Sequence, residues 1–192
     1  MEARTYFSDY VRDHSALPVD TRSTVLAIVA LHADRTTWET LHTLAQTATS
    51  EIEKQEIYGY LGAPRDPDLA QRALQLVLTD EAIVTTRPDI MSAVSQLHAD
   101  MAFDFAASHR EAVMAMLEPE TRNQFIPDLA SHSHEQAMIP KVRAYAKAHI
   151  PATARQSAVK AEAQIAYKVK IRQVRLGAVD RWLKAAEHGT RS

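Results

Sequence analysis

Apolar residues recur along most of the chain at intervals of three or four positions, the spacing that places them on one face of an α-helix. One clear instance is the run Leu69, Ala73, Leu76 and Val77. The composition favours the same structure, because the 192 residues include 32 alanines, which form helices most readily, and only four glycines. Asn-Gly and Asp-Gly pairs, typical of tight β-hairpin turns, do not occur in the sequence. The pattern therefore predicts an all-α protein.

Prolines mark where several of these helices begin. Pro67, Pro88, Pro119 and Pro151 each open a stretch of helix-forming residues, a position where the missing N–H does no harm. Asp66, just before Pro67, is the expected N-cap of its helix. Together with the apolar spacing, these marks predict about ten helices, near residues 2–14, 20–33, 36–47, 51–61, 66–78, 88–97, 99–108, 109–117, 120–130, 134–149 and 152–187.

Many short helices with short connections are typical of an α-solenoid, in which sequential neighbours pack antiparallel. We therefore expect an α-α superhelix of the HEAT or armadillo kind, closed by a long C-terminal helix. No linker rich in Gly, Ser or Pro divides the chain, so the sequence predicts one domain over residues 1–192. Within it we expect a partial first helix at residues 1–14 and a long basic closing helix at residues 151–187.

The C-terminal segment differs from the rest of the chain in charge. Residues 151–192 carry nine Lys or Arg and three Asp or Glu, a net charge of +6, whereas residues 1–150 carry 13 and 21, a net charge of −8. The segment also has two apolar stripes, one made of Ile165, Val169, Leu176, Val179 and Leu183, the other of Tyr167, Ile171, Val174, Ala178 and Trp182. A helix that is apolar on two faces is usually packed on both, so we expect this one to be covered on two sides.

Arg172 falls inside the first stripe. A guanidinium in that position is either paired with an acid or directed into a cavity, because an unpaired buried charge is very costly. In the first interpretation it caps an acidic solenoid through a salt bridge. In the second, Lys168, Arg172 and Arg175 line a concave surface that attracts anions. Nucleic acid is not an expected partner, because the pI is near 6.5 and no basic patch is interleaved with aromatic residues.

Composition excludes several classes of protein. Without cysteine the chain has no disulfide, thiolate metal site or cysteine nucleophile. The longest unbroken apolar run, Val25–Leu31, is far shorter than a membrane span, so no membrane partner is expected. The first residues, Met1–Arg4, lack the apolar core of a signal peptide. The composition thus predicts a soluble helical protein.

Nine histidines raise the question of a metal site. His132 and His134 form the densest cluster, but two histidines at i and i+2 do not share a helix face, and no third ligand is near in sequence. The pair His134-Glu135 begins the zinc-protease signature, yet Met138 stands where the second histidine belongs. The nucleophile elbow and the glycine-rich phosphate and dinucleotide loops are also missing. We therefore expect no catalytic residue, no metal ligand and no cofactor in this chain.

Four short stretches carry a family resemblance. In chain order they are Tyr58-Gly59-Tyr60-Leu61-Gly62, Asp66–Leu76, Met101-Ala102-Phe103-Asp104-Phe105 and Val179-Asp180-Arg181-Trp182-Leu183. Together they resemble the C-terminal helical domain of M1 zinc aminopeptidases, in particular the endoplasmic-reticulum-aminopeptidase-like and puromycin-sensitive branch in its bacterial form. Their order and spacing fit over residues 15–183.

The resemblance implies that this chain is the C-terminal portion of a longer enzyme. The family's His-Glu-x-x-His zinc motif and its Gly-x-Met-Glu-Asn segment, absent here, belong in family members to an earlier thermolysin-like domain. There the C-terminal domain resembles a bowl of paired helices that encloses a chamber and contacts the peptide. The implied partners are the zinc-bearing catalytic domain of the same polypeptide and peptide substrates. From position and charge, we expect peptide contacts at Arg172, Lys168, Arg175 and Arg143.

The main alternative is a stand-alone α-solenoid that binds a protein partner through its concave face, which would also need no catalytic group. Another is a small helical metal hydrolase that uses His132 and His134. Any signal peptide of the parent enzyme would lie upstream of Met1, so the sequence is compatible with the bacterial cytoplasm and with the periplasm. It leaves open the preferred residue and length of the peptide and the oligomeric state.

Overall fold

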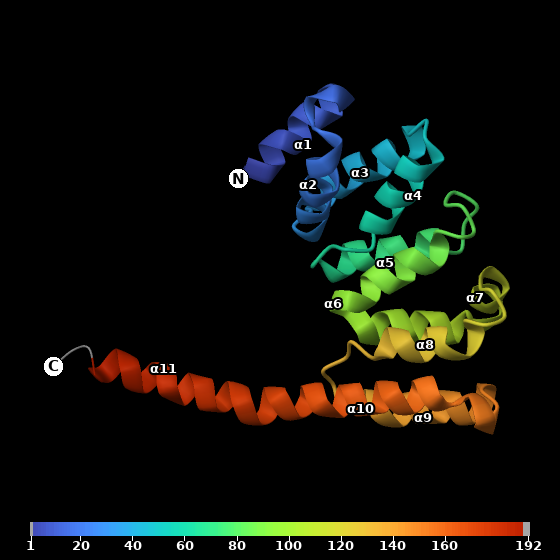
Figure 1. Cartoon of the computed structure of the whole chain (residues 1–192), viewed down its shortest axis with the longest axis vertical. Coiled ribbons are helices and arrows are strands. Elements are labelled where there is room, and N and C mark those ends of the chain that lie inside the picture. The colour runs from blue at the N-terminus through green and yellow to red at the C-terminus, as the bar shows by residue number, and fades with distance from the viewer. Residues whose placement is uncertain (1, 190–192) are drawn as a thin grey trace. The chain divides into compact units, whose positions relative to one another are not determined.

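A computed structural model describes residues 2–189, with the side chains of all of these except residues 175, 176 and 184–189. Every regular element in this range is a helix, which confirms the predicted fold class (Figure 1). The chain forms two compact units, residues 1–122 and 123–192. The two units are not separated by a linker rich in Gly or Pro. That they form one domain over residues 1–192 stays a prediction. None of the helices described here has both the length and the hydrophobicity needed to cross a bilayer.

In the N-terminal unit, neighbouring helices pack on one another in chain order. They are α1 (Glu2–Arg12), a 3₁₀ turn (His14–Ala16), α2 (Val19–Leu31), α3 (Arg35–Thr47), α4 (Glu51–Tyr60), α5 (Pro67–Leu76), α6 (Arg87–Ser108) and α7 (Arg110–Met116). The pairs are α1 with α2, α3 with α4 and α5 with α6, while α4 also contacts α2 and α6. Such nearest-neighbour packing is what an α-helical superhelix requires.

The helix starts follow the capping residues of the sequence. The Asp66 carboxylate accepts a hydrogen bond from the Asp68 backbone N–H at 2.9 Å, with Pro67 in the first turn, as predicted. The break expected between residues 97 and 99 is a kink inside one helix, α6. At the kink His98 has φ −128° and ψ 50°, and its Nε2 lies 2.9 Å from the Pro64 carbonyl oxygen. That polar contact holds the kink in place, and the non-helical backbone at His98 separates two helical stretches of α6 at the predicted position.

The core of the N-terminal unit is organised around Trp38. Its indole Nε1 donates to the Leu61 carbonyl at 3.0 Å, and the Arg72 guanidinium lies 4.6 Å above the ring centroid. Just after Leu61, the chain passes so close to α6 that a Cβ at Gly62 would lie 2.5 Å from the Ile90 carbonyl oxygen. Only glycine fits there, and the end of α4 therefore packs directly on the backbone of α6.

Glu81, between α5 and α6, joins three parts of the N-terminal unit. Its Oε1 accepts a hydrogen bond from the Tyr58 hydroxyl of α4 at 2.9 Å and contacts Nε2 of His42 in α3. Burial raises the pKa of the Glu81 carboxyl, but the hydrogen bonds from His42 and Tyr58 outweigh it and leave the pKa lowered. Burial and the bond to Glu81 raise the pKa of Tyr58. The charged carboxylate is thus the form that holds these elements together.

We expect Glu81→Gln to lower the free energy of unfolding by about 1.5–3 kcal/mol at neutral pH, the usual worth of hydrogen bonds to a charged group. Because the pKa of Glu81 is lowered in the folded state, its carboxylate stabilises the fold fully at pH values above the ordinary glutamate pKa of 4.5. This stabilisation decreases as the pH falls through the lower pKa that Glu81 has in the folded state. The difference between wild type and variant should therefore shrink in acid. Urea unfolding followed by circular dichroism from neutral to acid pH measures it.

The matched control is Glu120→Gln, which neutralises an exposed glutamate in the connection before α8. It should change the unfolding free energy by only a few tenths of a kcal/mol. A Glu81→Gln effect no larger than this, or one that persists unchanged in acid, would contradict the role given to Glu81.

The C-terminal unit is built around one helix pair. Its elements are α8 (Arg122–Ala130), which begins at the unit boundary, α9 (Met138–His149), a 3₁₀ turn (Ala152–Ala154), α10 (Gln156–Lys170), a π-helical segment (Ile171–Leu176) and α11 (Gly177–Gly189). Helix α10 packs along α9, and α11 continues past the end of α9 (Figure 1). The Arg155 guanidinium fixes the connection, because its Nε donates to the Ala146 and Ile150 carbonyls at 3.0 and 2.8 Å.

The expectation that the closing helix is packed on two faces is wrong for the side chains described. Ile165 and Val169 are buried, but Tyr167, Val174 and Trp182 of the second stripe are 58%, 58% and 69% exposed. Val179 and Leu183, which continue the first stripe, are about half exposed as well, and the side chain of Leu176 lies outside those described.

The first stripe does not stay buried because α11 continues past the end of α9, the helix against which α10 packs (Figure 1). The i→i+5 hydrogen bonds of the π-helical segment also give more residues per turn than an α-helix has. Residues after Leu176 are therefore rotated relative to the straight α-helix that the sequence pattern assumed.

Candidate functional site

Two of the predicted peptide-binding residues meet at one hollow of the C-terminal unit. Lys168 lies near the end of α10 and Arg172 in the π-helical segment, and both line a hollow of about 330 Å³ together with His134 and Ile171. We call this site the basic hollow. The i, i+4 spacing of the two cations on one helix places their side chains next to each other.

Lys168 is held in place by the loop after α8. Its Nζ donates to the Ser131 backbone carbonyl at 2.8 Å. Burial lowers the pKa of Lys168, because desolvation disfavours the charged ammonium. An ammonium has three N–H donors and the carbonyl accepts one of them. An anion in the hollow would therefore find a cation that has already lost part of its hydration.

The sequence left two alternatives for Arg172, a salt bridge to an acid and a place in a concave basic site, and the structure shows both. Its Nη1 donates to Glu135 Oε1 at 2.7 Å, and the guanidinium also lines the basic hollow. The pair is not buried, since each side chain is 60% exposed. Because a guanidinium carries five N–H donors in a planar fork, the bond to Glu135 leaves it able to bind a second carboxylate.

The other two predicted residues are not part of the basic hollow as described. Arg143 of α9 binds Glu162 of α10, with its Nε and Nη2 at 3.1 and 2.5 Å from the same carboxylate oxygen. This ion pair joins the two helices of the C-terminal unit and raises the pKa of Arg143. The side chain of Arg175 lies outside the described residues.

The sequence missed the role of the loop between α8 and α9. No pattern in the sequence indicates that His134 lines the basic hollow or that the Ser131 carbonyl anchors Lys168. Burial lowers the pKa of His132, and the nearby charge of Lys168 lowers it further. Among the side chains that the structure describes, no three His, Asp or Glu are grouped to hold a metal ion.

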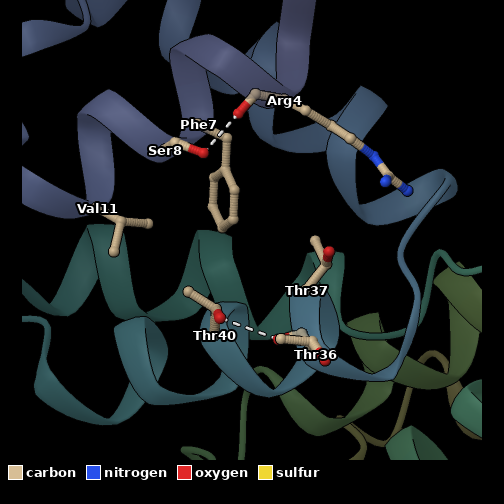
Figure 2. A pocket seen from close by; sticks show the side chains of 7 residues that line it. All are labelled: Arg4, Phe7, Ser8, Val11, Thr36, Thr37 and Thr40. Atoms are coloured by element: carbon tan, nitrogen blue, oxygen red, sulfur yellow. Dashed lines mark hydrogen bonds between the residues drawn. The ribbon is translucent and has the colours of Figure 1, made fainter. Parts of the chain in front are cut away.

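A second hollow, of about 310 Å³, lies between α1 and α3 (Figure 2). Its lining is rich in hydroxyl groups, and two of these bond within their own helices: Ser8 donates to the Arg4 carbonyl at 2.9 Å and Thr40 to the Thr36 carbonyl at 2.9 Å. The Arg4 guanidinium is engaged with the His32 carbonyl at 3.0 Å. This hollow offers weaker polar recognition than the basic hollow, which we take as the candidate site.

The electrostatic setting of the basic hollow also favours anions. Residues 123–192 carry 12 Lys or Arg and five Asp or Glu, a net charge of +7. A concave site in a positively charged unit raises the local concentration of anionic ligands. Within the hollow, Lys168 and Arg172 can each donate to an oxygen of one carboxylate. The arrangement is suited to binding a carboxylate.

Comparison with known protein families identifies the class to which the chain belongs. Residues 1–166 match the family described as the ERAP1-like C-terminal domain. The match covers most of the chain, and the chain therefore belongs to this family. It confirms the aminopeptidase C-terminal domain that the sequence stretches indicated, of which the first three lie in the matched residues and the fourth, at residues 179–183, lies beyond them. Lys168 and Arg172 lie just beyond the matched residues.

We expect Arg172→Ala to lower the free energy of unfolding by less than about 1 kcal/mol, because exposed ion pairs contribute little. Arg143→Ala should cost more, since it leaves Glu162, whose side chain is mostly buried, without its cation. Urea unfolding of the two variants side by side gives the comparison. A loss of several kcal/mol in Arg172→Ala alone would mean that Arg172 has a structural role and would argue against a binding role.

Proposed function

We propose that this chain is the non-catalytic helical domain of an M1 zinc aminopeptidase of the bacterial puromycin-sensitive-like branch. In this role it encloses the chamber in which the N-terminal residue of a peptide is removed. The proposal is supported by membership of the ERAP1-like C-terminal domain family and by helices that pack in chain order, as in a HEAT-like solenoid. Its partners are the catalytic domain of the same polypeptide and the peptide.

The basic hollow supplies the observation that carries the proposal. A peptide whose N-terminus lies at a catalytic centre still has a free carboxylate at its other end. Lys168 and Arg172 would bind that carboxylate, and Ser131 and Glu135 would hold the two cations in position. Binding the far end of the substrate orients the peptide without taking part in the chemistry.

Zinc does not fit the described residues of this chain, since they hold no suitable group of ligands. In the proposed enzyme the catalytic domain supplies the metal, and no part of the role of this chain passes through it. What the chain contributes is enclosure and peptide binding. Closing a domain over a substrate excludes water and helps to position it.

The test compares a short peptide that has a free C-terminal carboxylate with the same peptide as its amide. At low salt, where the Debye length is about 30 Å, the wild-type chain should bind the acid and bind the amide about tenfold more weakly. The double variant Lys168→Gln/Arg172→Gln should remove that preference. Fluorescence anisotropy of labelled peptides measures it.

Arg143→Gln is the matched control, because it removes a cation of the same unit outside the basic hollow. It should keep the preference for the acid. Equal affinity for acid and amide in the wild type would contradict carboxylate binding. Cleavage of an aminoacyl reporter by the purified chain would contradict the non-catalytic role.

A further inference from the structure

The outward face of α10 and α11 carries apolar side chains that nothing in the structure covers. Tyr167, Val174 and Trp182 are each more than half exposed and lie at intervals of seven and eight residues along the helix. They extend over about 23 Å at a rise of 1.5 Å per residue. A row of exposed aromatic and aliphatic side chains of this length marks an interaction surface. We call these three residues the apolar row.

Basic side chains accompany the apolar row. Lys170 and Arg181 are exposed on the same continuous helix, and the unit as a whole has a net charge of +7. A matching surface would have to be acidic and to offer a place for an aromatic side chain. Because the C-terminal unit is itself positively charged, most of its surface is not acidic enough to be the partner of the apolar row.

The N-terminal unit meets both conditions. Residues 1–122 carry 10 Lys or Arg and 19 Asp or Glu, a net charge of −9. Between α1 and α2 this unit has a hollow of about 470 Å³, large enough for an indole side chain, lined among others by Tyr6, Leu17, Pro18, Asp20 and Val25. The lining is mostly apolar and Asp20 adds a carboxylate. We call it the α1–α2 hollow.

We propose that the C-terminal helix of one copy of this chain docks on the N-terminal unit of a second copy, with Trp182 inserted in the α1–α2 hollow. Burial of the indole supplies the apolar contact, and Arg181 lies next to it in sequence to pair with Asp20. Every chain carries both the acidic, hollowed surface and the basic, aromatic one. This inference does not depend on the proposed function.

The contact joins two different surfaces, so it is a head-to-tail association rather than a symmetric one. Two copies joined in this way leave one docking helix and one α1–α2 hollow free, and larger assemblies can follow. The opposite charges of the two surfaces make the association sensitive to salt.

The first measurement is the mass of the full chain in solution as a function of concentration. Analytical ultracentrifugation at low salt should show the mass rising from 21.4 kDa for one chain towards that of two. Raising the salt to about 0.5 M should weaken the association about tenfold. Trp182 fluorescence should shift to shorter wavelength as the copies associate, because the only other tryptophan, Trp38, is already buried.

Two variants disable opposite ends of the contact. Trp182→Ala removes the inserted side chain, and Asp20→Arg/Thr24→Arg places bulk and positive charge at exposed positions of the α1–α2 hollow. Each variant alone should stay monomeric. An equal mixture should form a complex of one copy of each, because one intact helix and one intact hollow remain. Ile52→Ala, which shortens an exposed apolar side chain of α4, should associate as the wild type does.

Three results would overturn the proposal. The first is a wild-type chain that stays monomeric at all concentrations, as it would if the helix docked within its own chain. The second is a mixture of the two variants that forms no complex. The third is a monomeric chain that instead binds vesicles of phosphatidylserine and phosphatidylcholine through Trp182, which would assign the apolar row to a membrane surface.

Discussion

The fold depends on one constraint: each of these short helices can bury its apolar face only against a neighbouring helix. In the N-terminal unit this is achieved by stacking α1 on α2, α3 on α4 and α5 on α6. Polar contacts then fix the positions of the stacked helices: the Leu61 carbonyl accepts from Trp38, and Glu81 accepts from Tyr58. In the C-terminal unit the same constraint is met mainly by the pairing of α9 with α10, and the described side chains of α11, which continues from α10, remain largely exposed.

The sequence stretch that resembles the aminopeptidase family most clearly is a packing motif. In Tyr58-Gly59-Tyr60-Leu61-Gly62, Tyr58 binds Glu81, the Leu61 carbonyl binds Trp38 and Gly62 touches α6. Family membership can be read from these residues because the stacking of helices requires them. The residues of the basic hollow are under no such requirement, and Lys168 and Arg172 lie outside the matched part of the chain.

Local features were predictable and long-range polar contacts were not. Helix class, the Asp66 cap and the break near His98 follow from propensity, capping and the apolar spacing, all of which act over a few residues. The contact between Lys168 and Ser131 joins positions 37 residues apart, and no pattern in the sequence indicates it. The two apolar stripes were not covered as predicted, because α11 continues past the end of α9 and Tyr167 of the second stripe is exposed even within α10.

Gly62 has a consequence for the shape of the N-terminal unit. The distance between the end of α4 and α6 is set by the absence of a side chain, since a methyl group would already meet the Ile90 carbonyl and the Ala93 side chain. In a stack of helices, the spacing between one layer and the next determines how strongly the stack bends. The curvature of the N-terminal unit therefore depends on the absence of a side chain at Gly62, and a larger residue there would force α4 and α6 apart.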